Sequence, residues 1–256
     1  MTGGGGSEPA TACRLGVLAF GDSITNAGGE LQWGVALQSW ALWMARALGM
    51  PYTGFAVDGA TVADVVAQQI PTFERRTANL AGRYHVGCLY IGVNDVRSID
   101  WDADAFAADF DTALRYVAGR CDRVLTATAP LALGRPPAGA KVRDLNRIVR
   151  NTADRLGALV VDLSSFGARN HVMVDRVHPT AFGQISIAER ALAVLTADGL
   201  APRATPASMI QYRTTRWTRL RGDSTYIYRD LKARARAAID LYRLRRYLAQ
   251  QAAERN

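Results

Sequence analysis

The chain has few residues that could build a disulfide framework or a metal centre. Its three cysteines, Cys13, Cys88 and Cys121, form an odd and widely spaced set, which fits neither a disulfide scaffold nor a zinc site. Two of its three histidines, His85 and His171, have no second metal ligand at a useful spacing, so we expect them to be structural. The sequence therefore predicts no metal site.

Long apolar runs are also absent. A membrane-spanning helix needs about 20 consecutive apolar residues, and no such run occurs. Residues 1–13 are rich in glycine and lack the basic stretch and apolar core of a secretory signal. Because glycine-rich segments are flexible, we expect a flexible N-terminal segment. Since neither a membrane span nor a secretory signal is found, we expect a cytoplasmic protein.

Acidic residues are scarce in the C-terminal part of the chain. Residues 203–247 hold twelve of the 31 Lys and Arg but only three of the 23 Asp and Glu. Residues 1–202 are close to neutral by the same count, so the formal net charge of +8 belongs to the C-terminal segment. The basic charge therefore belongs to a C-terminal appendage and not to the body of the protein.

What is present, at 49% hydrophobic and 21% charged residues, is the composition of a globular domain. Apolar, strand-like runs alternate with amphipathic helical segments as far as residue 198. Such alternation predicts a three-layer α/β/α sandwich around a five-stranded parallel sheet with right-handed crossovers. The expected strands are 15–20, 55–57, 85–93, 124–129 and 158–163, and the expected helices are 33–48, 61–70, 102–118, 141–156 and 181–195.

Residues 199–256 lie outside this pattern. Residues 201–208 are rich in proline and alanine and predict a linker, and residues 226–253 predict one long, basic, amphipathic helix. Such a helix fits packing on the body or on another subunit, and it also fits an anionic membrane surface met through residues 203–247. Nucleic acid is the least favoured partner, and the oligomeric state is left open.

Four short polar segments directly follow apolar runs. Taken alone, each fits a turn or a helix cap. In a parallel sheet they meet at one edge, which brings a hydroxyl, an imidazole, a carboxylate and oxyanion donors together, as acyl transfer requires. The segments are FGDSIT at 20–25, VDGAT at 57–61, IGVND at 91–95 and DRVHP at 175–179.

These segments resemble, in order, the Ser, Gly, Asn and His blocks of the SGNH (GDSL-type) hydrolase family, over about residues 14–198. The matching residues are Ser23, Gly59, Asn94 and His178. The resemblance implies the flavodoxin-like SGNH fold and an esterase without metal or organic cofactor. The substrate would be a small-molecule or lipid ester, such as a lipid, a lysophospholipid or an acetylated sugar.

The resemblance also implies a role for each residue. Ser23 Oγ would attack the ester carbonyl, His178 would take and return the proton, and Asp175 would hold the imidazole. The oxyanion hole would combine the backbone N–H groups of Ser23 and Gly59 with the side-chain amide of Asn94.

The chain departs from the family pattern in three places. Gly54 stands about where the family often has Asn, and Asp58 directly precedes Gly59, which both bear on substrate preference. Ile24 replaces the usual Leu, a change expected to be neutral. Two alternatives stay open: an acyltransferase that uses the same site, and a non-catalytic scaffold that acts through the basic helix.

Three further features have a structural and a functional interpretation. The aspartates at the start of the helix at 102–118 favour helix N-terminal charge over a cation site. The tryptophans of the first helix favour core packing over a cleft wall. The residues are Asp100, Asp102, Asp104, Trp33, Trp40 and Trp43, and the stiff segment LGRPP at 133–137 is expected to border the cleft.

Overall fold

The structure is a computed structural model that describes residues 14–32, 34–211 and 215–254. The predicted flexible segment 1–13 and Trp33 lie outside the described residues. A five-stranded parallel sheet forms the centre, with the strand order β2-β1-β3-β4-β5. The strands are β1 (Val17–Gly21), β2 (Tyr52–Gly54), β3 (Tyr84–Tyr90), β4 (Cys121–Ala127) and β5 (Leu159–Val161).

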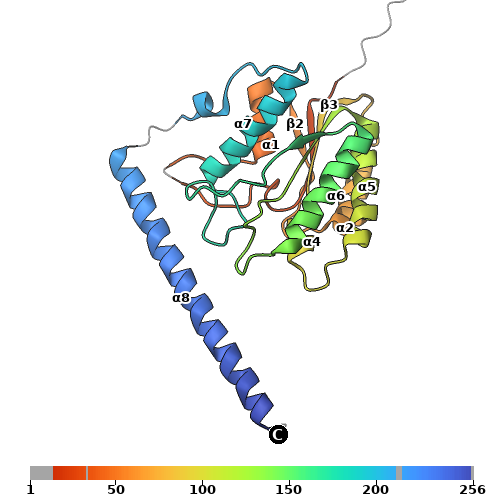
Figure 1. Ribbon diagram of the computed structural model, residues 1–256. Helices are drawn as coiled ribbons and strands as arrows, with labels where there is room; N and C mark the ends of the chain where they lie inside the picture. Colours follow the sequence, from red (N-terminus) through yellow and green to blue (C-terminus); the bar gives the residue numbers. More distant parts are fainter. Residues whose placement is uncertain (1–13, 33, 212–214, 255–256) are drawn as a thin grey trace, which may run out of the picture.

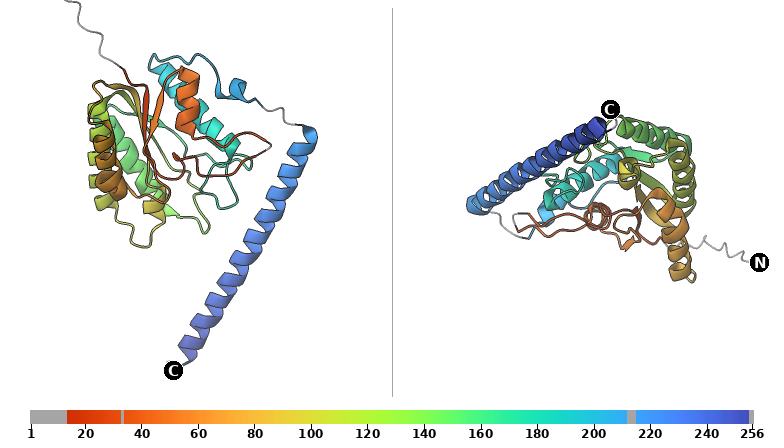
Figure 2. Two further views of the ribbon diagram at one scale, coloured as in Figure 1. Left: turned by 180° about the vertical axis from the view of Figure 1, so that it is seen from behind. Right: turned by 90° about the horizontal axis from the view of Figure 1, so that it is seen from below.

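Helices cover both faces of this sheet (Figures 1 and 2), so the predicted three-layer α/β/α sandwich is confirmed. Two helices lie on one face, α1 (Trp40–Leu48) and α7 (Ala181–Ala197). The opposite face is covered by α2 (Val62–Asp64), the π-helical turn η1 (Val65–Gln69), α3 (Ile70–Thr77), α5 (Ala103–Arg120) and α6 (Ala140–Leu156).

The strand order reverses direction between β1 and β3. The chain moves from β1 outward to β2, then returns across β1 to β3 and proceeds to β4 and β5. β1 is buried along its whole length, as expected for a strand with helices on both sides. In such sheets the ligand binds where the order reverses, beyond the carboxyl ends of the strands. The ends of β1 and β3 therefore mark the place to look for a site.

Several predicted bounds shift for identifiable local reasons. The first helix begins at Trp40 and not at residue 33, because Ser39 caps it by accepting from Ala41 N–H at 3.2 Å. The third strand ends at Tyr90, because Gly92 adopts φ 110° and opens the short helix α4 (Val93–Arg97). Asp102 caps α5 as predicted, accepting from two backbone N–H groups.

The second strand lies at residues 52–54 and not at the predicted 55–57. The segment after it still runs along β1, since Phe55 N–H donates to the Ala19 carbonyl at 2.8 Å and Val57 N–H to the Gly21 carbonyl at 3.1 Å. This keeps residues 57–61 beside the end of β1. The helix that follows begins with a reciprocal cap between Thr61 and Asp64 and extends to residue 77, beyond the predicted 70.

The C-terminal segment forms a short 3₁₀ turn, η2 (Pro206–Met209), and one long helix, α8 (Arg216–Glu254). This helix begins ten residues before its predicted start at 226. Figures 1 and 2 show it crossing one side of the body at an angle to the sheet. In the described part of the chain, no helix is long and apolar enough to span a membrane.

Candidate active site

Ser23 stands in a tight turn directly after β1. Gly21 ends that strand with φ 152°, and a Cβ at this position would approach the Tyr90 carbonyl oxygen to 2.4 Å, so only glycine fits. The Ser23 residue is 9% exposed, with its side chain at the floor of a cavity. The backbone at the end of β1 thus presents one hydroxyl group to the cavity and buries the rest of the turn.

Ser23, His178 and Asp175 form one chain of hydrogen bonds. Ser23 Oγ lies 2.9 Å from His178 Nε2, and His178 Nδ1 lies 2.7 Å from Asp175 Oδ2. The other oxygen, Asp175 Oδ1, accepts from the backbone N–H groups of Val177 and His178 at 2.9 and 3.1 Å. The carboxylate is therefore fixed by its own loop, and it fixes the imidazole in turn.

The pKa shifts of Asp175 and His178 both favour the charged form of the group concerned. Burial raises the pKa of Asp175, but the hydrogen bonds from the His178 ring and from two backbone N–H groups outweigh it, so the pKa lies below the ordinary value. The hydrogen bond to Asp175 raises the pKa of His178 above the ordinary 6.5, against an opposing effect of burial. A neutral His178 can take a proton from Ser23, and the resulting imidazolium is stabilised by Asp175.

The cavity above Ser23, which we call the Ser23 cavity, has a volume of about 410 Å³. It gathers residues of all four polar segments and the glycines that follow Ser23 in the chain. The lining residues are Ser23, Gly28, Gly29, Asp58, Gly59, Asn94, Met173 and His178. All five residues expected from the sequence are thus brought together, with Asp175 behind His178.

Gly59 and Asn94, the two residues expected to donate to an oxyanion, both line the Ser23 cavity. Gly59 adopts φ 78°, a conformation that glycine takes without strain, and no heavy atom lies within 4 Å of a Cβ built there. Asn94 Nδ2 donates one hydrogen bond to the Ala60 carbonyl at 2.9 Å. An amide nitrogen has two N–H groups, so one remains for a ligand.

Asp95, beside Asn94, has a positioning role that its motif alone did not reveal. Its two carboxylate oxygens accept from Val62 N–H at 3.0 and 3.3 Å. This joins the first turn of α4 to the segment that carries Gly59. The two candidate oxyanion donors are thereby held in one arrangement.

Two buried glutamines also hold the nucleophile turn, and sequence reasoning missed both. Gln69 bonds Gly21 twice, accepting from its N–H at 3.1 Å and donating to its carbonyl at 2.8 Å. Gln184 donates to the Ile24 carbonyl at 2.9 Å and accepts from Trp40 N–H at 2.8 Å. A glutamine within an amphipathic helix looks like any surface residue, so the sequence carried no signal for either.

Asp22 is the third feature found only in the structure. It is 1% exposed, its Oδ1 accepts from Ile24 N–H at 2.9 Å, and its Oδ2 has no partner among the described residues. Burial raises its pKa from the ordinary 3.8 to about 7, although the hydrogen bond from Ile24 and the nearby His178 act the other way. An ionisable carboxyl group is thus buried next to Ser23 in the chain.

The remaining candidates have structural surroundings. Trp40 and Trp43 belong to the buried core, which confirms core packing for both, and Trp40 Nε1 donates to Thr25 Oγ1 at 3.2 Å. His171 stacks on Phe166 at 5.7 Å between ring centroids. In the described ranges no cluster of three possible metal ligands occurs. Segment 133–137 lies against the triad loop, since Gly134 N–H donates to the Arg176 carbonyl at 2.9 Å.

Comparison with known structures agrees on the fold. An acetylxylan esterase from Geobacillus stearothermophilus is 20% identical, with a TM-score of 0.56 over 72% of this chain and 96% of the esterase. An α/β hydrolase enzyme from the metagenome of Lake Arreo, Spain, is 21% identical, with a TM-score of 0.55 over 70% of this chain and 94% of that enzyme. Among curated proteins there is no match to this chain.

The family model of the GDSL-like lipase/acylhydrolases matches residues 19–184, which is well over half of the chain and includes all four polar segments. The chain therefore belongs to the GDSL-like lipase/acylhydrolase family and is an ester-hydrolysing enzyme.

Proposed function

We propose that this protein is a serine esterase that cleaves a carboxylic ester through an acyl-enzyme on Ser23. The observation that carries the proposal is the hydrogen-bond chain from Ser23 through His178 to Asp175 at the floor of the Ser23 cavity. These are the groups that acyl transfer needs, at hydrogen-bond distances.

The reaction has two halves. Ser23 Oγ attacks the ester carbonyl carbon while His178 takes the hydroxyl proton, and the negative charge develops on the carbonyl oxygen. The backbone N–H groups of Ser23 and Gly59 and the amide of Asn94 donate to that oxygen. His178 then protonates the leaving alcohol, and the acyl-enzyme remains.

In the second half, His178 takes a proton from water, which attacks the acyl carbon. The oxyanion forms again, collapses, and releases the acid while Ser23 Oγ recovers its proton from His178. No step needs a metal or an organic cofactor.

The direct test is covalent labelling of Ser23. A fluorophosphonate probe should label the wild-type protein, and both Ser23→Ala and His178→Ala should abolish labelling and cleavage of short p-nitrophenyl esters. Thr53→Ala, a substitution away from the Ser23 cavity, serves as the control. Labelling of Ser23→Ala at the wild-type rate would show that another residue is the nucleophile.

The length of the acyl group that the Ser23 cavity accepts needs its own measurement. The Geobacillus neighbour is described as an acetylxylan esterase, which makes a short acyl group on a sugar one candidate. A panel of p-nitrophenyl esters from acetate to dodecanoate, compared by kcat/KM, distinguishes a short-chain preference from a lipid-like one.

A further inference from the structure

A second cavity, of about 560 Å³, lies beside the Ser23 cavity, between α8 and the loop that carries Asp175. Its walls include Met173, Asp175 and Glu30. Met173 lines the Ser23 cavity as well, and residues 28–29, which also line that cavity, directly precede Glu30. The two cavities are therefore adjacent, and Met173 belongs to the wall of both.

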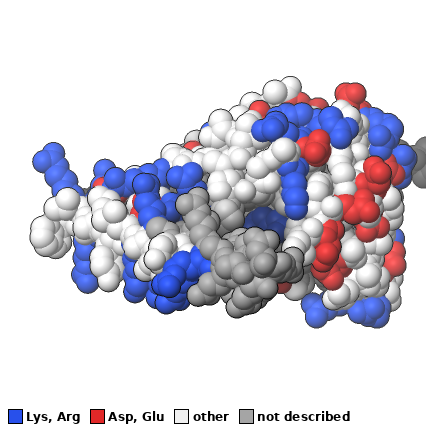
Figure 3. All heavy atoms as spheres, turned by 60° about the horizontal axis from the view of Figure 1, so that its bottom comes forward, with Lys and Arg blue, Asp and Glu red and all other residues white. Residues whose placement is uncertain are grey.

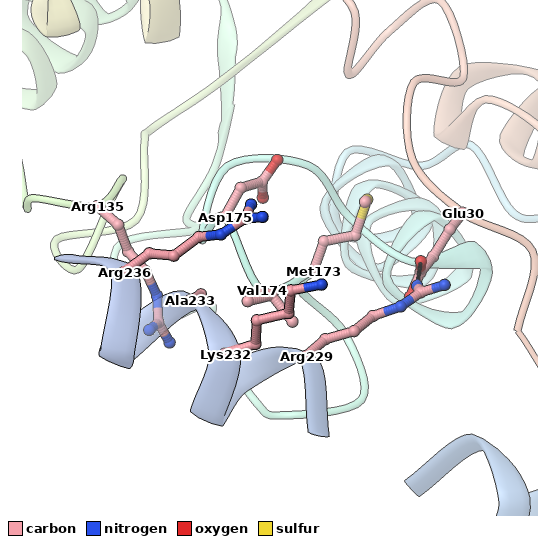
Figure 4. A pocket seen from close by; sticks show the side chains of 9 residues that line it. All are labelled: Glu30, Arg135, Met173, Val174, Asp175, Arg229, Lys232, Ala233 and Arg236. Atoms are coloured by element: carbon pink, nitrogen blue, oxygen red, sulfur yellow. Dashed lines mark hydrogen bonds and ion pairs between the residues drawn. The ribbon is translucent and has the colours of Figure 1, made fainter. Parts of the chain in front are cut away.

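The wall supplied by α8 is basic. Arg229, Lys232 and Arg236 contribute from this helix, and Arg135 contributes from the segment 133–137. Figure 4 shows Lys232 and Arg236 reaching from α8 toward the loop at 173–175, and Arg229 reaching toward Glu30. We call this space the basic cavity.

The acids around the basic cavity are already paired. Arg229 pairs with Glu30, and Arg135 pairs with Asp230 of α8. Asp175 is bonded to His178.

Lys232 and Arg236 have no ion pair with any carboxylate in the described part of the chain. Two cations without an ion pair among the described side chains therefore face a cavity that adjoins Ser23.

We propose that the basic cavity binds an anionic group of the ester substrate, a carboxylate or a phosphate on its acyl or its alcohol part. Guanidinium and ammonium groups bind such anions by charge-assisted hydrogen bonds. The volume suits a small-molecule site, which usually measures about 300–1,000 Å³. The inference rests on the proposed esterase function, because the bound anion holds the ester carbonyl over Ser23.

The test compares each anionic ester with a neutral partner. One pair is the mono-p-nitrophenyl ester of glutaric acid against p-nitrophenyl pentanoate, and the other is 4-acetoxybenzoate against phenyl acetate. In Lys232→Ala/Arg236→Ala, the ratio of anionic to neutral kcat/KM should fall about five- to tenfold for at least one pair. Added salt should reduce the wild-type ratio toward that of the variant.

Arg221→Ala/Arg243→Ala is the matched control, because it removes two α8 cations that do not line the basic cavity. It should leave both ratios unchanged. Equal ratios in wild type and Lys232→Ala/Arg236→Ala would overturn the inference while cleavage of the neutral esters upheld the esterase. If the wild-type protein cleaved no ester and took no fluorophosphonate, the esterase proposal itself would fail.

An independent observation concerns which face of α8 meets the body and which face is exposed. The helix meets the body through its polar face: Arg169 pairs with Asp223 at 3.4 Å and lies 5.5 Å from the ring centroid of Tyr226, and Arg135 pairs with Asp230. Positions 223, 226 and 230 are three and four residues apart and so share one face of the helix.

The opposite face carries a stripe of apolar side chains. At about 100° per residue the stripe covers about a third of the helix circumference, on the side away from Tyr226. Its members are 50–73% exposed. An amphipathic helix normally turns its apolar side to the body, and α8 does the reverse. The members are Trp217, Leu220, Tyr228, Leu231, Ile239 and Tyr242.

The charge around the apolar stripe decides between partners. Residues 203–247 carry twelve cations and three anions, and three of these cations line the basic cavity. Figure 3 shows Lys and Arg distributed along the α8 arm. A second α8 laid on the stripe would bring like charges together, whereas an anionic lipid surface would neutralise them. We infer that α8 lies on an anionic membrane surface, with the apolar stripe in the lipid and the arginines at the headgroups.

Vesicle sedimentation of the full chain tests this second inference. The wild-type protein should sediment with vesicles of phosphatidylcholine and phosphatidylserine, and not with phosphatidylcholine alone. Leu220→Gln/Leu231→Gln should reduce the partition coefficient about tenfold or more. The control Leu80→Gln/Ile99→Gln replaces exposed apolar residues of the body and should bind as wild type does.

Two outcomes would overturn the membrane inference. One is equal sedimentation of wild type and Leu220→Gln/Leu231→Gln. The other is no vesicle binding together with a dimer, seen by analytical ultracentrifugation, that Leu220→Gln/Leu231→Gln dissociates. The second result would assign the apolar stripe to another copy of this chain.

Discussion

His178 must be neutral to accept the proton of Ser23, and its surroundings hold the proton on the ring. The hydrogen bond and charge of Asp175 raise the pKa of His178 above 6.5. Activity should therefore rise with pH along a limb whose midpoint lies above 6.5, as measured by kcat/KM on a neutral ester.

The same pair predicts the effect of removing the charge. Asp175→Asn keeps the size of the side chain but loses the charge that raises the His178 pKa, so the acidic limb should move to lower pH. The rate at the plateau should fall by up to about 10⁴, because the imidazolium loses its stabilising carboxylate. If the acidic limb of Asp175→Asn stays at the wild-type pH, the limb reports the titration of another group, such as Asp22.

Sequence reasoning located the candidate reacting residues but not the residues that hold them in position. Ser23 and His178 stand in motifs with unusual composition after apolar runs, so they were visible in the sequence. Gln69 and Gln184 act through buried hydrogen bonds to the nucleophile turn. Their importance comes from burial, which depends on what packs over them.

The helix α7 connects the loop of His178 to the turn that carries Ser23. α7 begins just after His178, where Thr180 caps it by accepting from Gly183 N–H at 3.1 Å. From its first turn Gln184 reaches the nucleophile turn at the Ile24 carbonyl. The start of α7 thus sets the position of His178 relative to Ser23, although the two residues are 155 positions apart in the chain.

Some helix ends were predicted from the sequence, and others were not. α6 ends at Gly157 in the left-handed conformation with φ 65°, as its glycine predicted. α8 extends ten residues further toward the N-terminus than predicted. Its first turns contain Arg216 and Trp217, which the apolar periodicity of residues 226–253 did not include.

The stability of the whole molecule should depend on the ionisation of Asp22. Its pKa is 3.8 ordinarily and about 7 in the folded protein, so the folded state holds this proton more tightly than the unfolded chain does. The free energy of unfolding should therefore decrease as pH rises from about 4 to about 7. The cause is the cost of placing a charge where Oδ2 has no partner among the described residues.

Asp22→Asn isolates this effect, since the amide oxygen can still accept from Ile24 N–H but carries no charge. Urea unfolding at several pH values should show a smaller decrease in stability for the variant than for wild type between pH 4 and 7. His178 adds a decrease of the same sign above its ordinary 6.5, because its folded pKa is also raised. Parallel curves for the two proteins would contradict the assigned Asp22 pKa.

The sequence alone determined the layered fold, the family and the residues of the candidate triad. Each of these follows from local composition: apolar runs that alternate with amphipathic ones, and polar motifs at the ends of strands. The reversal of strand order between β1 and β3 then brings those motifs to one cavity.

Only the tertiary structure decided what surrounds the triad. The burial of Asp22, the glutamine contacts and the basic cavity arise where segments far apart in the chain meet. The orientation of α8 also depends on contacts between segments far apart in the chain. Its sequence shows an apolar and a basic face, but which face meets the body is settled by partners at Arg135 and Arg169, more than 50 residues away in the chain.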